Sequence, residues 1–395
     1  MLRSPLAWLA AIVLAGCAQA PQKPEALACP AAPACPACPV CPVPKAPEAA
    51  RYEEASFAAL PGWSTADARQ SLGAFLSSCP RGGVLAPLCE AARAVPQGDD
   101  DAARRFFEER FTPYALASSD SGDVGLVTGY YEPVIQGSRS RDAINRQPIY
   151  GVPDDLVVVD LAAVNPEVRN LRLRGRLEGR RLVPYYSRAE IESRGSALAA
   201  PVIAWAADPV ELFFLQIQGS GIVNFADGGR VRVGYADQNG HPFRSLGRYL
   251  VERGELTLDQ ASMQGIQAWA AANPSRLQAA LDQNPSFVFF RELPDAGGPI
   301  GALGIPLSAG YSIAVDRRFV PLGAPVYLAT TYPLSSNPLE RLVVAQDTGG
   351  AIRGVVRADF FWGTGAEAGA AAGRMRQQGR MWLLWPRGEA PPRPN

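Results

Sequence analysis

Apolar residues recur at helical spacing in two parts of the chain, residues 66–116 and residues 243–282. A spacing of three or four residues places such side chains on one face of a helix. The positions that carry the pattern are Ala68, Leu72, Phe75, Leu76, Ala102, Phe106, Phe107 and Phe111, and then Leu246, Tyr249, Leu250, Met263, Ile266, Trp269, Leu277 and Leu281. We therefore predict helices in both parts, and the alanines of residues 363–378 predict another.

Elsewhere in the globular part, short apolar runs alternate with Gly, Pro, Asn and Asp. Runs bounded by such turn residues are typical of β-strands. They occupy residues 125–131, 156–159, 181–183, 212–217 and 231–233, and the same texture returns in residues 286–386. The pattern predicts a mainly β fold with flanking helices.

The first residues have the pattern of a targeting segment. A positive charge at Arg3 precedes an apolar stretch, residues 6–14, that is too short to span a bilayer, and Leu14-Ala15-Gly16-Cys17 is a small-residue cleavage site ending in Cys. Residues 1–16 resemble a bacterial lipoprotein signal peptide. This implies acylation of Cys17, and the following Ala18 implies an outer-membrane lipoprotein facing the periplasm. The alternative, an ordinary secretory signal peptide, would not need the Cys.

Residues 17–50 are dominated by Pro, Ala and Cys. Such a segment cannot bury a core, so we predict an extended tether. Cys35, Cys38 and Cys41 have the spacing of a metal clip, but no His is near and Pro directly follows Cys35 and Cys41, which favours disulfides or mixed thiol states over a metal. Further along, Cys79 and Cys89 bracket a loop short enough to be closed by one disulfide, which we also predict.

Composition narrows the possible chemistry. The chain has 395 residues, with 38 Lys and Arg against 38 Asp and Glu and a single His, His241. Zero formal net charge provides no electrostatic footprint for nucleic acid, which requires clustered Lys and Arg. A single His argues against His-based metal sites and against Ser-His or Cys-His catalysis. No motif implies a metal or an organic cofactor, so carboxylate chemistry remains.

The most concentrated candidate chemistry lies in residues 343–365. Two strand-like runs, residues 343–346 and 354–361, are joined by a Gly-rich turn. Period-two alternation places Val355, Arg357, Asp359 and Phe361 on one face of the second run. Because Asp is poorly suited to a strand interior, Asp359 is either a structural partner of Arg357 or a carboxyl held for use. Apolar neighbours would raise its pKa, and a contact with Arg357 would oppose that shift.

Three segments, each containing an aspartate, resemble the three-aspartate domain: Asp316 in residues 312–323, Asp347 in 346–354 and Asp359 in 357–365. Five upstream segments are similar to those of the membrane-bound lytic murein transglycosylase A family. They are Thr128–Pro133, Leu182–Arg188, Phe213–Gly221, Gly234–Phe243 and Asn284–Phe290. The resemblance covers residues 51–386.

This resemblance implies a fold. We expect a double-psi β-barrel domain built from residues 51–133 and 284–390, with N-terminal helices. A second β-barrel domain, residues 134–283, would be inserted between these two parts. A groove for a glycan would lie between the two domains.

The resemblance also implies an activity. The family cleaves the β-1,4 bond between N-acetylmuramic acid and N-acetylglucosamine in peptidoglycan without water and leaves 1,6-anhydromuramoyl ends. Asp359 would be the single catalytic acid and base, Asp347 a supporting site residue, and Asp316 structural. Independently of the resemblance, the polar side chains of Thr128, Gln218 and Ser220 suit hydrogen bonds to sugar hydroxyls, and Trp362 could offer an apolar ring face. The segments of Thr128, Gln218 and Ser220 also suit a strand that ends in a turn.

Peptidoglycan strands are therefore the expected partner, together with unidentified cell-wall synthesis or scaffold proteins.

Two other functions compete with this interpretation. A non-catalytic peptidoglycan-binding lipoprotein would have the same fold. Asp347-Thr-Gly and Asp120-Ser-Gly echo the paired signature of aspartic proteases, but no strand precedes the polar loop of Asp120.

Overall fold

The computed structural model describes residues 49–79, 84–161, 163–165, 173–294 and 297–393. The predicted signal peptide, Cys17 and nearly all of the predicted tether lie outside the described residues. Among the residues that are described, no helix is both long and apolar enough to cross a membrane. The chain from residue 47 onward forms one compact unit.

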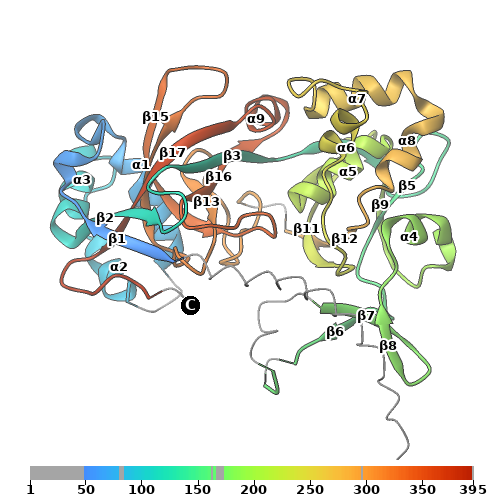
Figure 1. Ribbon diagram of the computed structural model, residues 1–395, viewed down its shortest axis with the longest axis horizontal. Helices are drawn as coiled ribbons and strands as arrows, with labels where there is room; N and C mark the ends of the chain where they lie inside the picture. Colours follow the sequence, from blue (N-terminus) through green and yellow to red (C-terminus); the bar gives the residue numbers. More distant parts are fainter. Residues whose placement is uncertain (1–48, 80–83, 162, 166–172, 295–296, 394–395) are drawn as a thin grey trace, which may run out of the picture. The chain divides into compact units, whose positions relative to one another are not determined.

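Six strands of the largest sheet close into a barrel (Figure 1). The eight-stranded sheet has the order β1-β2-β17-β14-β15-β13-β16-β3, and the additional pairing of β17 with β3 closes the ring. Its strands are β1 Ala50–Glu54, β2 Phe111–Ser118, β3 Gly125–Glu132, β13 Ser312–Val315, β14 Pro325–Thr331, β15 Pro338–Asp347, β16 Arg357–Thr364 and β17 Arg376–Pro386. Apolar side chains from all six barrel strands fill the interior, among them Val127, Ile313, Val343 and Phe360. The predicted mainly β fold with a barrel is confirmed.

Three helices pack against the outside of this barrel: α1 Ala68–Ser78, α2 Ala86–Arg93 and α3 Asp100–Arg110. Two 3-10 turns, Phe57–Ala59 and Trp63–Thr65, precede them. The carboxylates of Asp67 and Asp99 cap α1 and α3 by accepting hydrogen bonds from backbone N–H groups of the first turn. The predicted disulfide between Cys79 and Cys89 is confirmed and joins the end of α1 to α2.

The helical pattern predicted as far as residue 116 ends sooner. The last residue of α3 is Arg110, and from Phe111 the chain is extended and pairs with β17. The Phe111 ring nevertheless packs against Phe75, Phe106 and Phe107. The spacing therefore identified a shared aromatic cluster correctly but assigned the backbone of Phe111 to the wrong element.

A second sheet has six strands in the order β12-β11-β10-β4-β9-β5. They are β4 Val134–Ser138, β5 Gln147–Tyr150, β9 Val202–Ala206, β10 Ser220–Phe225, β11 Arg230–Gln238 and β12 Val288–Leu293. A bridge between Gly151 and Phe290 joins the two edges of this sheet, and its core contains Ile135, Val223 and Val233. The sheet extends past residue 283, because β12 is one of its edge strands.

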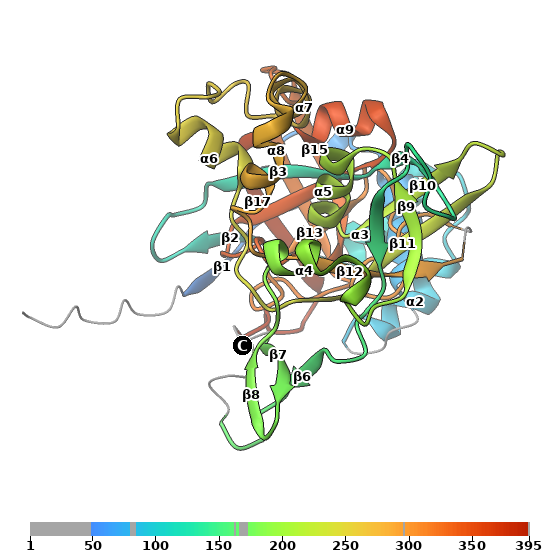
Figure 2. The ribbon, with the colours of Figure 1, turned by 90° about the vertical axis from the view of Figure 1, so that its right-hand side faces the viewer.

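Smaller elements accompany the second sheet. A three-stranded sheet contains β6 Val157–Val159, β7 Leu173–Glu178 and β8 Arg181–Pro184. The helices are α4 Arg188–Arg194, α5 Pro209–Gln218, α6 Leu246–Glu252, α7 Met263–Ala272 and α8 Pro274–Leu281, with a 3-10 turn at Gly195–Ala197. The helices predicted in residues 243–282 are confirmed as α6, α7 and α8, which lie together next to α5 (Figure 2).

One strand assignment is wrong. Residues 212–217, predicted as a strand, belong to helix α5, which starts after the capping carboxylate of Asp208 and ends at Gly219, whose φ is +78°. This apolar run faces protein on several sides, so it lacks the periodicity that separates a helix from a strand. The helix predicted within residues 363–378 is confirmed as α9, Ala366–Ala372, and β17 begins at Arg376.

A buried ion pair connects the two sheets where β3 continues through Pro133 into β4. Glu132 is fully buried and binds Arg232 of β11. Its second carboxylate oxygen accepts a hydrogen bond of 2.8 Å from the Thr364 hydroxyl. Removing one partner of a buried pair leaves an uncompensated charge, so this pair fixes the path of β3 between the sheets.

Candidate active site

Asp347, Ala314, Asp359 and Thr128 lie side by side in a row across four neighbouring barrel strands. Ala314 in β13 pairs with Asp347 in β15 on one side and with Asp359 in β16 on the other. Asp359 also pairs with Thr128 in β3. Directly opposed residues point to the same face of a sheet, and two strand spacings place the aspartate Cα atoms about 9–10 Å apart. The barrel therefore presents two carboxyl groups and a hydroxyl on one face.

The alternation predicted for β16 holds within the strand. Ala358 and Phe360 belong to the barrel interior, whereas Arg357 and Asp359 do not. Val355, which was predicted to share the face of Asp359, belongs to the interior instead. The reason is that β16 begins only at Arg357, so the period of two does not extend back to Val355.

Asp359 is held by its neighbours in β3 and β16. The Thr128 hydroxyl donates to Asp359 Oδ1 at 2.5 Å, and Arg357 Nη2 donates to the same hydroxyl at 2.9 Å. Arg357 thus reaches Asp359 through Thr128 rather than through a direct ion pair. Among the described residues, Asp359 Oδ2 has no hydrogen-bond partner, which leaves one carboxyl oxygen for a ligand.

Burial raises the pKa of Asp359 above its usual value, although the hydrogen bond from Thr128 and the charge of Arg357 oppose the shift. Both predicted influences on this carboxyl are therefore present, and burial is the larger. A carboxyl of this kind keeps its proton closer to neutral pH than an exposed aspartate does. The arrangement suits a proton donor.

Asp347 is the second perturbed carboxyl. Burial, together with the nearby charge of Asp359, raises its pKa to about 6. Its Oδ1 accepts backbone N–H groups of Ala302 and Thr348, each at 2.9 Å, and its Oδ2 accepts the Tyr130 hydroxyl at 3.2 Å. These three donors hold the carboxyl toward Asp359 and limit the rise of its pKa.

The contact of Tyr130 with Asp347 was not predicted from the sequence, although Tyr130 lies in the same segment as Thr128. Its hydroxyl binds Asp347, and its ring packs against Phe361 with the centroids 5.1 Å apart. Burial and the charges of Asp347 and Asp359 raise the pKa of this hydroxyl well above its usual value. Its position two residues after Thr128 on the same strand face could have identified it.

Asp316 is separate from this row. It is fully buried and forms an ion pair with Arg318, in which Arg318 Nη2 lies 2.6 Å from Asp316 Oδ2. The Gly354 N–H also donates to Oδ2 at 3.0 Å. Burial raises the pKa of Asp316, but these donors outweigh burial and hold it below the usual value. The predicted structural role agrees with this geometry, since the contacts tie the end of β13 to the loop before β16.

The remaining predicted contact residues, Gln218, Ser220 and Trp362, make contacts outside this row. Gln218, at the end of α5, accepts the Tyr131 N–H with its side-chain oxygen at 3.2 Å. Ser220 begins β10 close by and pairs with Gly234. Trp362 packs against Phe360 and donates to the Met375 sulfur, and it lines a pocket of about 340 Å³ with residues of α9 and of the loop after β14. Its contacts therefore lie on the interior side of β16.

Several of the upstream segments meet in a buried polar network instead. Arg188 donates to Gln216, at 2.6 Å, and to backbone carbonyls of Asn284 and Ser286. Asn239 donates to two further carbonyls of the same region. Buried polar groups need such partners, so these residues hold the inserted sheet and its helices together. The sequence marked them without showing that their role is internal.

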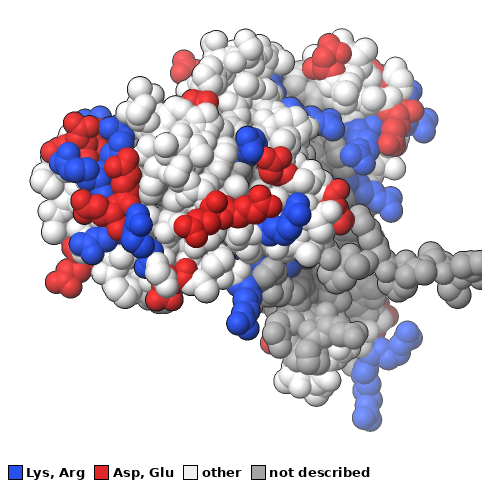
Figure 3. All heavy atoms as spheres, turned by 60° about the vertical axis from the view of Figure 1, so that its left-hand side comes forward, with Lys and Arg blue, Asp and Glu red and all other residues white. Residues whose placement is uncertain are grey.

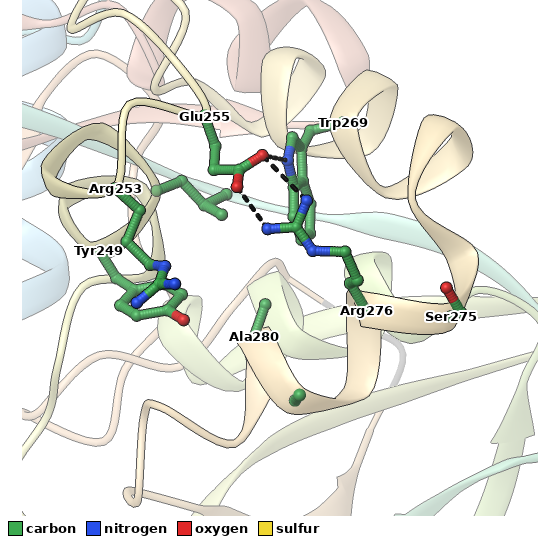
Figure 4. A pocket seen from close by; sticks show the side chains of 9 residues that line it. Tyr249, Arg253, Glu255, Trp269, Ser275, Arg276 and Ala280 are labelled. Atoms are coloured by element: carbon green, nitrogen blue, oxygen red, sulfur yellow. Dashed lines mark hydrogen bonds and ion pairs between the residues drawn. The ribbon is translucent and has the colours of Figure 1, made fainter.

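A pocket of about 210 Å³ lies between α6, α7 and α8, and its polar groups pair with one another (Figure 4). Glu255 accepts hydrogen bonds from Trp269 Nε1 at 3.1 Å and from Arg276. These bonds lower the pKa of Glu255, so the carboxyl is ionised at neutral pH. This pocket lacks the proton-donor chemistry of Asp359.

Other chemistries find little support in the described residues. Asp120 is exposed in the turn after β2, and the carboxyl that perturbs Asp347 is Asp359, so the protease pair is not formed. No described group of three or more His, Cys, Asp or Glu residues is placed to hold a metal ion. On the face in Figure 3, acidic and basic side chains are intermixed.

Comparisons with known proteins place this geometry in a family. A model of the MltA specific insert domain matches residues 126–291, and a model of the 3D domain matches residues 311–385. The chain is 36% identical to membrane-bound lytic murein transglycosylase A of Escherichia coli K12 over 267 residues, which are 65% of this chain and 64% of the relative's own length.

Solved structures of MltA are also similar to this chain. A crystal structure of MltA from Neisseria gonorrhoeae has a TM-score of 0.78 and 42% identity, covering 87% of this chain and 94% of that one. A crystal structure of E. coli MltA with bound chitohexaose has a TM-score of 0.63 and 30% identity, covering 85% of this chain and 91% of that one.

The raised pKa of Asp347 predicts how stability depends on pH. Its folded pKa of about 6 exceeds the value of about 3.9 in an unfolded chain, so ionisation of the native carboxyl costs stability between these values and above. We expect Asp347→Asn to raise the free energy of unfolding at pH 8 by about 1–3 kcal/mol. This gain in the free energy of unfolding should shrink as the pH falls through 6 toward 4. Denaturant unfolding at each pH measures it.

Asp316→Asn is the matched control, because the pKa of Asp316 is lowered in the folded state. That carboxylate contributes stability at high pH, and the contribution fades as the pH falls through its folded pKa. The control variant should therefore be destabilised at pH 8. Equal pH dependence of the two variants would contradict the assignment for Asp347.

Proposed function

The chain belongs to the membrane-bound lytic murein transglycosylase A family, and we propose that it is itself a lytic murein transglycosylase. Its substrate would be the glycan strand of peptidoglycan, cleaved at the β-1,4 bond between N-acetylmuramic acid and N-acetylglucosamine. The observation that carries the proposal is the Asp359 carboxyl, which has a raised pKa, one oxygen held by Thr128 and the other without a hydrogen-bond partner among the described residues.

In the proposed first step, protonated Asp359 donates its proton to the glycosidic oxygen as the bond to the anomeric carbon breaks. The sugar passes through an oxocarbenium-like state. The N-acetylglucosamine side leaves as an alcohol, and Asp359 becomes a carboxylate. The hydrogen bond from Thr128 and the charge of Arg357 stabilise this carboxylate, since both favour the ionised form.

In the second step, the Asp359 carboxylate takes the proton of the muramoyl C6 hydroxyl. The C6 oxygen attacks the anomeric carbon and closes a 1,6-anhydro ring, and Asp359 regains its proton. Because the nucleophile belongs to the substrate, one carboxyl suffices, whereas glycoside hydrolases use two. Exclusion of water from the site favours this outcome over hydrolysis.

Asp347 would support the reaction without exchanging a proton with the glycosidic oxygen. It lies across Ala314 from Asp359, and three donors hold it in place. At this distance it can accept a hydrogen bond from a sugar hydroxyl and orient the ring. Its negative charge would also help to stabilise a cationic sugar that lies next to Asp359.

The glycan would lie between the barrel and the inserted domain, which includes β12 in addition to the predicted residues 134–283. Two contacts support this position, since Gln218 and Met263 of the inserted part bind Tyr131, three residues after Thr128. The similar E. coli MltA structure contains bound chitohexaose. Gln218 and Ser220 would contact the strand from the inserted domain, and Thr128 from the barrel. Trp362 would serve a more remote sugar.

We further propose that the protein is an outer-membrane lipoprotein facing the periplasm, anchored through Cys17. The sequence of residues 14–17 supports the lipid anchor. The curated relatives carry the description "membrane-bound". Unidentified cell-wall proteins remain expected partners, on the basis of the substrate alone.

Asp359→Asn tests the mechanism. The amide keeps the size and the hydrogen bond to Thr128 but cannot donate a proton, so turnover of isolated murein should fall by at least about 10²- to 10⁴-fold. Unmodified protein should release products with 1,6-anhydromuramoyl ends, which mass spectrometry detects as a loss of one water relative to hydrolysis products.

Asp120→Asn, at an exposed aspartate, is the matched control and should leave turnover unchanged. Near-normal turnover by Asp359→Asn would remove Asp359 from the mechanism. Reducing muramoyl ends would make the protein a hydrolase, with Asp347 as its second carboxyl. Binding without any cleavage by unmodified protein would favour the non-catalytic alternative.

Ser220→Ala tests the position of the glycan. In the inactive Asp359→Asn background, we expect loss of the hydroxyl to weaken chitohexaose binding about fivefold or more, as one lost hydrogen bond predicts, when measured by calorimetric titration. Ser193→Ala is the control in the same domain, since its hydroxyl bonds back to the Glu190 carbonyl of its own helix. Equal affinities of both variants would place the strand elsewhere.

Cys17→Ser tests the anchor. The substitution removes the thiol that acylation requires, so the protein should move from the membrane fraction to the soluble fraction of cells and lose incorporation of labelled palmitate. Cys29→Ser, in the predicted tether, should change neither measurement. Continued acylation of the Cys17→Ser protein would be incompatible with a lipoprotein.

A further inference from the structure

The strand that carries Asp347 contains one extra residue just before it. Val344 and Ala345 of β15 pair in order with Ser312 and Ile313 of β13, but the next residue of β13, Ala314, pairs with Asp347. Gln346 is therefore the extra residue of a β-bulge. Without the bulge, Gln346 would stand opposite Ala314, and Asp347 would move one residue out of the row that contains Asp359.

The Gln346 side chain is fully buried and forms hydrogen bonds with the last turn of α1. Its Nε2 donates to the Ala74 carbonyl at 2.8 Å, to Ser77 Oγ at 2.9 Å and to Ser78 Oγ at 3.0 Å. Its Oε1 accepts the Ser312 hydroxyl at 2.5 Å. The Nε2 and Oε1 atoms of the amide thus both have hydrogen-bond partners when the side chain is turned toward the helix.

The backbone on the other side of the bulge is held as well. The Leu303 N–H donates to the Gln346 carbonyl at 3.3 Å, and the neighbouring Ala302 N–H donates to Asp347 Oδ1 at 2.9 Å. A Cβ atom at Gly301 would lie 2.7 Å from the Gln346 carbonyl oxygen, so this close approach requires glycine. One turn of the chain therefore contacts the extra residue and the carboxyl that follows it.

We propose that Gln346 is a positioning residue of the active site: by anchoring the β15 bulge to the last turn of α1, it places Asp347 in register with Asp359. The helix is remote in sequence from the carboxyls, and the Gln346 side chain connects it to the residue directly before Asp347. The consequence for catalysis rests on the proposed function, whereas the positioning itself does not.

A purely structural glutamine would give the same loss of stability without affecting Asp347. The chain offers a matched control, because Ser71 also joins α1 to β15. Its buried hydroxyl donates to the Leu342 carbonyl at 2.6 Å, on the same helix and strand but four residues before the bulge. Ser71→Ala should weaken the packing of α1 on β15 and leave the bulge intact.

The first measurement does not depend on activity. Asp347 is faced by the hydroxyl of Tyr130 and the carboxyl of Asp359, with Arg357 behind Thr128, and by the N–H groups of Ala302 and Thr348. In the otherwise unmodified chain, Asp347→Asn should stabilise more at pH 8 than at pH 4.5. In the Gln346→Ala background, the difference in stabilisation by Asp347→Asn between pH 8 and pH 4.5 should fall by half or more, since Asp347 no longer occupies the buried position. In the Ser71→Ala background it should persist.

The second measurement is turnover of murein. Gln346→Ala should lower kcat by about tenfold to a hundredfold with little change in KM, because the row is misplaced rather than the glycan surface removed. Ser71→Ala should lower it by less than about twofold at a temperature where both variants are folded. If Gln346→Ala does not fold, the double variant Ser77→Ala with Ser78→Ala replaces it, because it removes two acceptors of the Gln346 amide. It should change the pH-dependent stabilisation and kcat in the same direction as Gln346→Ala, but by a smaller amount.

An unchanged pH-dependent gain in the Gln346→Ala background would overturn the proposal. A gain lost equally in the Ser71→Ala background would also overturn it, since the effect would then belong to helix packing in general. Loss of the gain with unchanged turnover supports the positioning and removes Asp347 from the proposed reaction. Failure of this inference and failure of the proposed function are therefore distinguishable.

Discussion

The register of β15, β13, β16 and β3 decides whether this barrel can have an active site. Thr128 lies far from Asp347 and Asp359 in the sequence. The three side chains meet because Ala314 pairs with both aspartates and Asp359 pairs with Thr128. A slip of one residue in any pairing would send a side chain to the barrel interior. Closure of the ring by β17 and β3 opposes such a slip, because every strand is then fixed on two sides.

Burial has opposite consequences for stability and for chemistry at this row. It raises the pKa values of Asp359 and Asp347, which disfavours their charged forms and destabilises the fold near neutral pH. The same shift lets a carboxyl keep a proton to donate. Asp316 shows the contrast within one barrel, since Arg318 and the Gly354 N–H hold its pKa low and make it a stabilising ion pair. A direct ion pair separates the two roles, because Arg318 binds Asp316, whereas the described donors to Asp347 and Asp359 are uncharged hydroxyl and N–H groups.

Sequence periodicity predicted a mainly β fold and placed Asp359 on one strand face with Arg357, because alternation within a strand is a local property. The closed six-stranded ring depends on pairing between distant segments, and only the family resemblance implied a barrel. The hydrogen bond from Thr128 to Asp359 depends on such pairing too and was not predicted. The pattern was wrong for residues 212–217, where a run of apolar residues buried on several sides has no readable period. Gln346 and Tyr130 were missed for a similar reason, since their roles exist only in contacts across strands and to α1.

Strand β3 connects the chemistry of the barrel to the inserted sheet within five residues. Thr128 binds Asp359, Tyr130 binds Asp347, the Tyr131 N–H binds Gln218, and Glu132 binds Arg232 of the second sheet. The first two contacts set the geometry of the acid, and the last two set the path of the chain into the inserted part. Because a strand is nearly inextensible, a displacement of the inserted part along β3 would be transmitted to the hydroxyl that holds Asp359. The buried Glu132–Arg232 pair therefore contributes to the precision of a site with which it shares no atom.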